Sequence, residues 1–345
     1  MRLKRETRMR TKRAVPWRVA GACLVGTLIL VGGAACAQIG SSDPVTDQGR
    51  IISDLFNLEL VLALLLFLLV GGLLTAIIIR FRGRPGDMDP PQVMGNRKLE
   101  VTWTLLPVLV LACLFVLTVR TMNAVDAASP NELPVQVIGH QWWWEFHYEE
   151  QGIVTANELH LPVDTPLRLD LQSADVIHSF WLPQFGWMQD NVPGKTNQMR
   201  VRVNQVGDFV GACTQFCGVE HARMRLRVNV ESRDQFEAWA QQQEQPAAAP
   251  TSAASAHGQQ VFEQRTCANC HVIQGTSAQG KVGPDLTHLA SRATIGAGVL
   301  DNTPDNLRRW VKDAPGIKAG VLMPSFSNLS DADLSDLETY LEGLK

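Results

Sequence analysis

The chain has 345 residues, enough for two or three domains, and a formal net charge of −3. No basic stripe runs along it, so the charge pattern argues against a nucleic-acid-binding protein. Seven cysteines are present, and the last four form two close pairs, C-x3-C and C-x2-C. Such pairs are typical of metal or cofactor sites and not of a disulfide framework.

A basic segment followed by an apolar one opens the chain. Residues 1–18 carry eight Lys or Arg, and residues 19–35 carry no charge. This order is typical of an export signal, so we predict a signal peptide over residues 1–37. Two alternatives stay open: lipidation of Cys36, and retention of the segment as a third membrane helix.

Two further stretches are long and apolar enough to cross a bilayer. Residues 60–79 carry no charge, and a second apolar stretch covers residues 101–120. We predict a transmembrane hairpin over residues 50–122, with helices at about 55–79 and 101–120.

The loop between these two helices is basic. The positive-inside rule therefore places it in the cytoplasm and everything after Arg120 on the outer face. The basic residues of the loop are Arg80, Arg82, Arg84, Arg97 and Lys98.

The apolar pattern changes to period two between Val135 and Glu231. In residues 224–230, for example, apolar and polar side chains alternate as on a half-buried strand. Short strands separated by Pro, Gly and Asp turns predict an all-β domain over residues 133–231. Residues 240–256 contain only Ala, Gln, Pro, Ser, Thr and one Glu, which predicts a flexible linker.

The remaining segment, residues 257–345, is predicted to be a small all-α domain. One helix is expected to begin near His257 and to end at a Cys-x2-Cys-His motif. Thr303-Pro304-Asp305 is typical of a helix start, and Ser330 with Asp333 predicts the N-cap of the last helix.

One loop, residues 213–224, carries two thiols, an imidazole and a thioether. They are Cys213, Cys217, His221 and Met224, at intervals of four, four and three. Soft sulfur ligands with imidazole favour copper, and thiolates can bridge two metal ions. A two-copper centre needs one more imidazole, for which His178 is the candidate. The alternative is that His178 is an ordinary polar loop residue.

The second pair of cysteines belongs to the motif Cys267-Ala-Asn-Cys270-His271, which is typical of covalent haem attachment. Two thioethers would form at the cysteines, and His271 would bind the iron. Zinc binding is the alternative, but the predicted export favours haem. Met323 is the sole methionine of the helical segment and is the candidate for the second axial ligand, with His288 as the rival.

Several of these motifs, in the same order, resemble those of subunit II of haem-copper cytochrome c oxidases. That family has C-x-E-x-C-x3-H-x2-M with an upstream H-S-x-x-x-P, similar to residues 213–224 and 178–183 here. Its G-H-Q-W-x-W and D-x-x-P-G-x-x-N-Q motifs are similar to residues 139–144 and 190–198. The resemblance covers about residues 50–231 and implies a cupredoxin fold for the β-domain.

The resemblance also implies a dinuclear copper centre, CuA, and its ligands. These would be Cys213 and Cys217 as bridges, His178 and His221 as one cap each, Met224 as a weak axial ligand, and the backbone carbonyl of Gln215. The family usually has Glu at this last position, where its carboxylate reaches a magnesium site. Gln215 is neutral and cannot replace that charge, so the sequence leaves the magnesium site open.

Two more residues receive roles from the resemblance. Trp142 would be the surface aromatic through which an electron enters from cytochrome c. Because successive strand residues face opposite sides, at least one of Trp142, Trp143 and Trp144 should be exposed. Glu100, at the start of the second membrane helix, would lie at the mouth of a proton channel into subunit I. The alternative for Trp142 is an ordinary core aromatic. The alternative for Glu100 is a solvated charge at the end of the helix.

Residues 257–345 resemble a class I cytochrome c, because Gly283-Pro284-Asp285-Leu286 is similar to a loop near the haem. The Met323-Pro324 context is typical of that family and favours Met323 over His288. A cytochrome c domain fused to subunit II resembles the caa-type oxidases. The resemblance thus implies a multi-domain membrane protein: a transmembrane hairpin, an all-β cupredoxin domain and an all-α cytochrome c domain.

The implied function is that of subunit II in a proton-pumping terminal oxidase of the bacterial plasma membrane. Electrons from soluble cytochrome c would pass through the chain's own haem c and CuA to subunit I, which reduces oxygen to water. Subunits I and III would be its partners, and both redox domains would lie on the outer face. One alternative is a membrane-tethered electron carrier without a catalytic partner. A quinol oxidase subunit is another, although such relatives lack the copper ligands.

Overall fold

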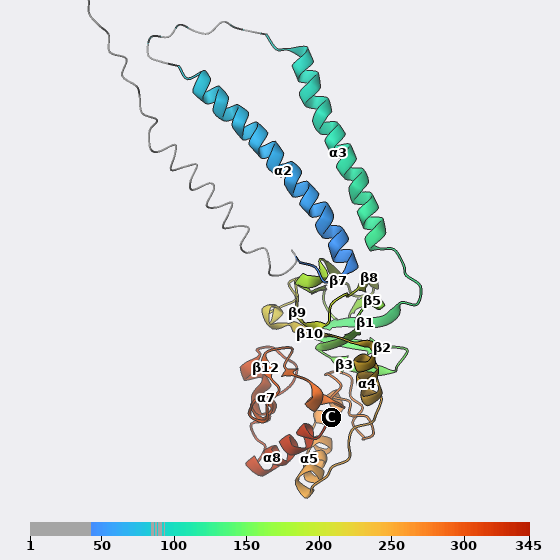
Figure 1. Cartoon of the computed structure of the whole chain (residues 1–345). Coiled ribbons are helices and arrows are strands. Elements are labelled where there is room, and N and C mark those ends of the chain that lie inside the picture. Colours follow the sequence, from blue (N-terminus) through green and yellow to red (C-terminus); the bar gives the residue numbers. More distant parts are fainter. Residues whose placement is uncertain (1–42, 84–85, 87, 89–91, 93) are drawn as a thin grey trace, which may run out of the picture.

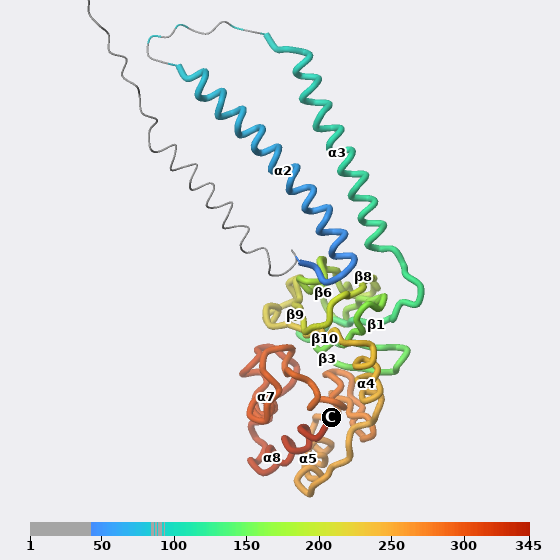
Figure 2. Tube along the Cα trace, viewed as in Figure 1, coloured from blue at the N-terminus to red at the C-terminus, as the bar shows by residue number. Residues whose placement is uncertain are grey.

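The computed structural model describes residues 43–345 except 84–85, 87, 89–91 and 93. A helical hairpin, a β-domain and a helical C-terminal domain follow one another along the chain (Figure 1). The C-terminal domain lies on the side of the β-domain away from the hairpin (Figure 2). The signal peptide predicted for residues 1–37 lies outside the described residues.

The hairpin consists of α2 (Asp47–Arg80) and α3 (Arg97–Val125), both long and apolar enough to cross a membrane. The prediction of two apolar helices is confirmed, and both are longer than expected. At 1.5 Å per residue, the 34 residues of α2 span about 50 Å, more than the ~30 Å hydrocarbon core. The surplus length of α2 extends to the β-domain.

The first turn of α2 is attached directly to the β-domain. The hydroxyl of Thr46 accepts a hydrogen bond from the N–H of Gly49 and donates one to the carbonyl of Phe185, at 2.9 and 2.7 Å. A Cβ atom at Gly49 would lie 2.5 Å from the same carbonyl oxygen, so only glycine allows this approach. The β-domain is therefore held close to the end of the hairpin.

The β-domain is a sandwich of two five-stranded sheets, which confirms the predicted all-β class. The sheet orders are β3-β2-β1-β5-β8 and β4-β10-β9-β6-β7. Burial alternates along most strands, so the inner faces form one core that includes Trp144, Phe146 and Tyr148. The strands are β1 (Leu133–His140), β2 (Trp143–Tyr148), β3 (Ile153–Ala156), β4 (Glu158–Pro162), β5 (Pro166–Ser173), β6 (His178–Trp181), β7 (Met188–Asn191), β8 (Asn197–Arg202), β9 (Gly207–Cys213) and β10 (Arg225–Glu231).

The segment expected to be a flexible linker, residues 240–256, is helical at both ends. Helix α4 (Arg233–Gln243) follows the last strand, and its Trp239 stacks on His160 of the β-domain at 4.2 Å. Helix α5 (Ala253–Gln264) begins at the N-cap Ser252. Serine caps and a packed aromatic stabilise helix in a polar, alanine-rich sequence, leaving only residues 244–252 outside both helices.

The C-terminal domain is built from α5, α6 (Cys267–Cys270), α7 (Pro304–Ile317) and α8 (Asp331–Glu342), with a small β11–β12 ribbon (Thr294–Ile295 and Leu300–Asp301). Two predicted helix starts are confirmed, because Thr303 and Ser330 are N-caps. The start predicted near His257 is wrong, since α5 begins at Ala253 and ends at Gln264, before the haem motif. Helix α5 crosses α8 at Gly258, where any side chain would overlap the carbonyl of Asp336. These helices surround the cavity described below.

Candidate metal and haem sites

The copper-type ligands lie where three strands of one sheet end or begin. Strand β9 ends at Cys213, and β10 begins just after Met224. The start of β6, at His178, lies beside them because Phe180 pairs with Cys213. Strand register therefore places a histidine 35 residues upstream against the cysteine loop.

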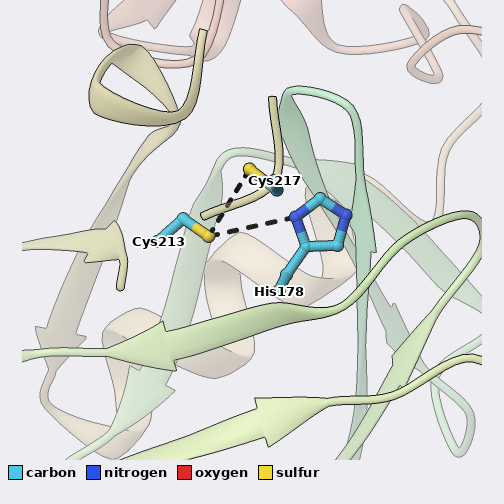
Figure 3. A group of neighbouring side chains, drawn as sticks. All are labelled: His178, Cys213 and Cys217. Carbon is cyan, nitrogen blue, oxygen red and sulfur yellow. Dashed lines mark hydrogen bonds between the residues drawn. The ribbon is translucent and has the colours of Figure 1, made fainter. Parts of the chain in front are cut away.

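All six predicted donor groups lie in one cluster. The two thiol sulfurs are 3.8 Å apart, and Cys213 Sγ is 3.9 Å from His178 Nδ1 (Figure 3). Cys217 Sγ is 3.6 Å from His221 Nδ1 and 3.8 Å from Met224 Sδ. The cluster is completed by the carbonyl oxygen of Gln215, at 3.2 Å from Cys213 Sγ.

The two cysteine thiols are buried, and the ionisation of each affects the pKa of the other. The contact between the two thiols lowers the pKa of Cys213 although burial opposes it, whereas the same contact and burial raise the pKa of Cys217. Proton loss at two interacting thiols belongs to the pair. A metal that binds both thiolates must displace the second proton, so we expect proton release on metal binding.

Two residues that the sequence did not reveal as part of the site determine where His178 lies. Asp175 Oδ1 is 2.7 Å from His178 Nε2, which directs Nδ1 toward the cysteines. A Cβ at Gly139 on β1 would lie 2.7 Å from the His178 ring, so glycine leaves room for the imidazole. For Asp175 the only signal in the sequence is its spacing of three from His178, which is weak, whereas Gly139 opens the motif at residues 139–144.

The chemistry of this donor set fits copper. Two thiols, two imidazoles and a thioether are the soft and borderline ligands that copper prefers, and adjacent thiolates can bridge two ions. Cys213, Cys217, His178 and Met224 are all buried, so water has little access to the cluster. The ends of strands β6, β9 and β10 hold these groups next to one another.

A cavity of about 400 Å³ opens between the C-terminal helices and the β-domain. Its walls include the haem-motif residues Cys267, Cys270 and His271, together with Met323. The volume is in the range of about 300–1,000 Å³ that is typical of cofactor pockets. The cavity therefore brings together all four residues that the sequence predicted for haem.

The loop after the haem motif orients His271. The Nδ1 atom of His271 is 2.7 Å from the carbonyl oxygen of Pro284 and can donate a hydrogen bond to it. The Nε2 atom is then left to bind a metal ion. A Cβ at Gly283 would lie 2.6 Å from the imidazole ring. Residues 283–284 thus contact the histidine of the motif.

The two candidates for the second axial ligand are placed differently. Met323 lines the cavity, whereas His288 is buried outside its walls. The Nε2 atom of His288 lies 3.2 Å from the carbonyl oxygen of Gln243 and 3.1 Å from that of Gln245. His288 therefore attaches the linker to the domain, and Met323 is the better placed candidate.

A buried arginine in the cavity wall provides a test of whether an anionic cofactor fits. Arg292 lines the cavity, and within the described part of the chain its Nε has no hydrogen-bond partner. Its Nη2 donates to the carbonyl of Asp285 at 2.6 Å, and burial lowers its pKa. A buried N–H of a cation that has no partner needs an acceptor, best a negatively charged one. The carboxylates of haem meet that need, so the residues present fit this group.

The tryptophan run differs from the expectation that at least one ring would be exposed. Trp142 is only 8% exposed because the C-terminal domain covers it, Trp144 is buried in the core, and Trp143 is half-buried against His140. Trp142 lines the cavity, and its Nε1 donates to the carbonyl of Cys217 at 3.1 Å. The ring therefore connects the cavity to the copper-type cluster.

Glu100 lies in the first turn of α3, at the end of the hairpin away from the β-domain (Figure 1). Asn96 caps this turn by accepting hydrogen bonds from Lys98 and Leu99. The Glu100 carboxylate is exposed, and its predicted role at a proton channel depends on a neighbouring subunit. The side chain of Gln215 is also exposed, so only its carbonyl belongs to the cluster.

Three family models match successive parts of the chain. They are the transmembrane domain of cytochrome c oxidase subunit II at residues 34–120, the periplasmic domain of the same subunit at residues 152–231, and cytochrome c at residues 255–345. In that order they match the hairpin, the β-domain from β3 onward, and the C-terminal domain.

Similar proteins cover most of the chain. Cytochrome c oxidase subunit 2 of Alkalihalophilus pseudofirmus is 34% identical over 92% of this chain and 94% of its own length. The Bacillus subtilis protein of that name is 32% identical over 78% of this chain and 81% of its own length. Quinol oxidase subunit 2 of Bacillus anthracis is 29% identical over 69% of this chain and 84% of its own length. The chain therefore belongs to the cytochrome c oxidase subunit II family, as a subunit of a haem-copper oxidase that carries an additional cytochrome c domain.

Proposed function

We propose that this subunit accepts electrons at a haem c in its C-terminal domain and delivers them through a CuA centre to subunit I. Subunit I would then reduce oxygen to water in a proton-pumping enzyme. The observation that carries the proposal is the convergence of all six copper-type donors on one buried cluster, next to a cavity that fits haem.

In this proposal Cys213, Cys217, His178 and His221 would hold the two copper ions. Met224 and the carbonyl of Gln215 would be further donors. Copper would supply one-electron redox chemistry, and the chain's part is to hold the donors still and to exclude water. The burial of the thiols and the hydrogen bond from Asp175 to His178 support that part.

For the haem we propose that Cys267 and Cys270 would hold it covalently and that His271 and Met323 would bind its iron. The Pro284 carbonyl fixes the tautomer of His271, and Arg292 balances the negative charge of the cofactor. A methionine opposite a histidine raises the redox potential of such a haem. This favours donation of electrons by a soluble cytochrome c.

Trp142 is proposed as the point at which an electron enters the CuA domain. Its ring borders the cavity and hydrogen-bonds to the Cys217 carbonyl, which supports transfer from the chain's own haem domain. Because that domain covers Trp142, a soluble donor would deliver its electron to the haem domain and not to the tryptophan directly.

The proposed location is the bacterial plasma membrane, with both redox domains on its outer face. Subunits I and III would contact the apolar hairpin, and Glu100 at its cytoplasmic end would lie at the entrance of a proton channel. A magnesium site that uses a carboxylate from residue 215 is not part of the proposal, because Gln215 has none.

The proposal is tested by Cys217→Ser in the assembled oxidase, with Cys113→Ser in α3 as the control. We expect Cys217→Ser to abolish CuA absorbance and oxygen consumption while a soluble donor still reduces haem c. Cys113→Ser should leave all three unchanged, because Cys113 lies in the membrane-spanning helix α3 and the cluster lies in the β-domain. Oxygen consumption that persists without CuA absorbance would contradict the proposal.

A further inference from the structure

A buried lysine of the C-terminal domain reaches into the β-domain. Lys318, just after α7, is 1% exposed, and its Nζ donates to the carbonyls of Trp142, Arg223 and Gly296 at 2.8, 3.0 and 2.9 Å. Burial lowers its pKa to about 8, with an opposing effect of Glu220, so the amine keeps three protons to donate at neutral pH. Only Gly296 belongs to its own domain.

The copper-ligand loop makes the reciprocal contacts to the same segment. Glu220 Oε1 accepts from the N–H of Ala319 at 2.9 Å, and Arg223 Nη2 donates to the carbonyl of Ile317 at 2.6 Å. Glu220 and Arg223 lie between the proposed copper ligands Cys217 and Met224. Residues 317–319 lie a few positions before Met323, so the two ligand-bearing segments are hydrogen-bonded to each other.

A second group of contacts fixes the rotation between the domains. Glu158, buried at the start of β4, accepts from the N–H groups of Ala293 and Thr294 at 2.8 and 3.0 Å. The N–H of Arg225 donates to the carbonyl of Ala297 at 3.2 Å. Two separate sets of directional bonds leave one relative orientation, in which Trp142 faces the cavity.

A role confined to the C-terminal domain does not explain these contacts. Desolvating an ammonium group is expensive unless its protons are all satisfied. Here two of its three acceptors come from the β-domain, one of them the backbone of Trp142 itself. The energetic benefit of burying Lys318 therefore depends on the domains being docked.

We propose that Lys318 is a positioning residue that locks the haem domain onto the copper-ligand loop, so that Trp142 is held between the two sites in a single orientation. The docking itself follows from protein contacts alone. Only its consequence for electron transfer rests on the proposed function.

Hydrogen exchange of the full-length protein in detergent tests the docking. Lys318→Met should speed exchange in peptides that cover residues 139–144 and 217–225 by about tenfold or more, because donors to three carbonyls are lost. Lys312→Met is the matched control, since Lys312 is exposed on α7, and it should match the wild type. Exchange of these peptides at the wild-type rate in Lys318→Met would overturn the proposal.

If Lys318→Met unfolds the domain, a comparison of two single substitutions at Glu158 tests the docking of the domains instead. Glu158→Ala removes the acceptor for Ala293 and Thr294, whereas Glu158→Gln keeps an amide oxygen in its place. We expect faster exchange of residues 139–144 in the alanine variant only. Equal exchange in Glu158→Ala and wild type would count against a docked arrangement.

A distance measurement in the loaded protein tests the consequence for the redox sites. Pulsed electron paramagnetic resonance between the oxidised haem and the copper centre should give one narrow distance distribution in the wild type. Lys318→Met should broaden or lengthen it while both absorption spectra persist. An unchanged narrow distance distribution in Lys318→Met, with both spectra intact, would overturn the proposal. If copper does not bind at all, the proposed function fails, and the exchange experiment still decides the docking.

Discussion

Single residues next to the donors determine the geometry of the copper-type cluster. Gly139 leaves space for the His178 ring, and Asp175 orients that ring. Burial opposes ionisation of Asp175, but the hydrogen bond to His178 outweighs it and lowers the pKa of the carboxyl group. The His178 ring is thus held by the ionised carboxylate of Asp175.

Asp175→Asn should weaken copper binding. An amide holds the imidazole less firmly and lowers its basicity, and loss of such a partner typically costs about 10–100-fold in metal affinity. Competition with a copper chelator measures the change in the purified protein. Asp190→Asn, at an exposed position of β7, serves as the control. An affinity for copper that is unchanged in Asp175→Asn would show that the carboxylate does not support the ligand.

Glu145 is predicted to make the free energy of unfolding decrease at low pH. Burial opposes its ionisation, but hydrogen bonds with His140 and His147 outweigh this and lower its pKa from 4.5 to about 2. Because the folded-state pKa is the lower one, the stabilisation is complete above pH 4.5 and is lost as the pH falls toward 2.

Glu145→Gln tests this dependence. At pH 7 the variant should be less stable by up to roughly 3 kcal/mol, and the difference should fall to about half at pH 3. Thermal unfolding of both proteins across this pH range measures the effect. A stability difference that stays constant with pH would mean that the ionisation of Glu145 does not contribute.

At the scale of elements, close approach between helices depends on glycine. Gly258 on α5 faces the backbone of α8 so closely that a methyl group would overlap the Asp336 carbonyl. Loss of this contact would disturb the helix pair that bounds the cavity, since Phe262 on α5 and Leu337 and Leu341 on α8 line it.

Gly258→Ala should therefore destabilise the C-terminal domain although alanine favours helix by up to about 1 kcal/mol. Overpacking in a tight contact typically costs about 1–3 kcal/mol, so we expect a net loss and a lower yield of covalently bound haem. Gln260→Ala, exposed on the same helix, is the control. Unchanged thermal stability in Gly258→Ala would show that α5 and α8 can move apart freely.

At the scale of the whole molecule, the hairpin exposes far more apolar surface than tethering requires. The apolar windows of α2 and α3 have no residues buried within the chain. In a bilayer such faces can contact lipid or the helices of other subunits. A tethered carrier needs one helix, and the two helices here are both long enough to span.

We therefore expect a large polytopic partner to co-purify with the chain in mild detergent. Association should persist in Cys217→Ser, because the contacts lie in the membrane and not at the cluster. Size-exclusion chromatography with mass spectrometry of the eluted complex measures this. Elution of the chain alone from native membranes would favour the tethered electron carrier.

Local patterns in the sequence were enough for much of the fold. Uncharged runs predicted the hairpin, period two predicted the β-domain, and Thr303 and Ser330 predicted two helix starts. The donor residues could also be named, because sulfur and imidazole at short intervals indicate their chemistry whatever the surroundings. Element ends were less accurate, since caps and packing extended α2 and α3.

The sequence by itself determined the types of element and the donor chemistry, because both depend on side chains within a few positions of one another. Only the tertiary structure decided the burial of Trp142, the contacts of Lys318 and the support of His178 by Asp175 and Gly139. Trp142 and Lys318 are separated by 176 residues and belong to different domains. No local periodicity encodes such a contact, because it forms only when two folded surfaces meet.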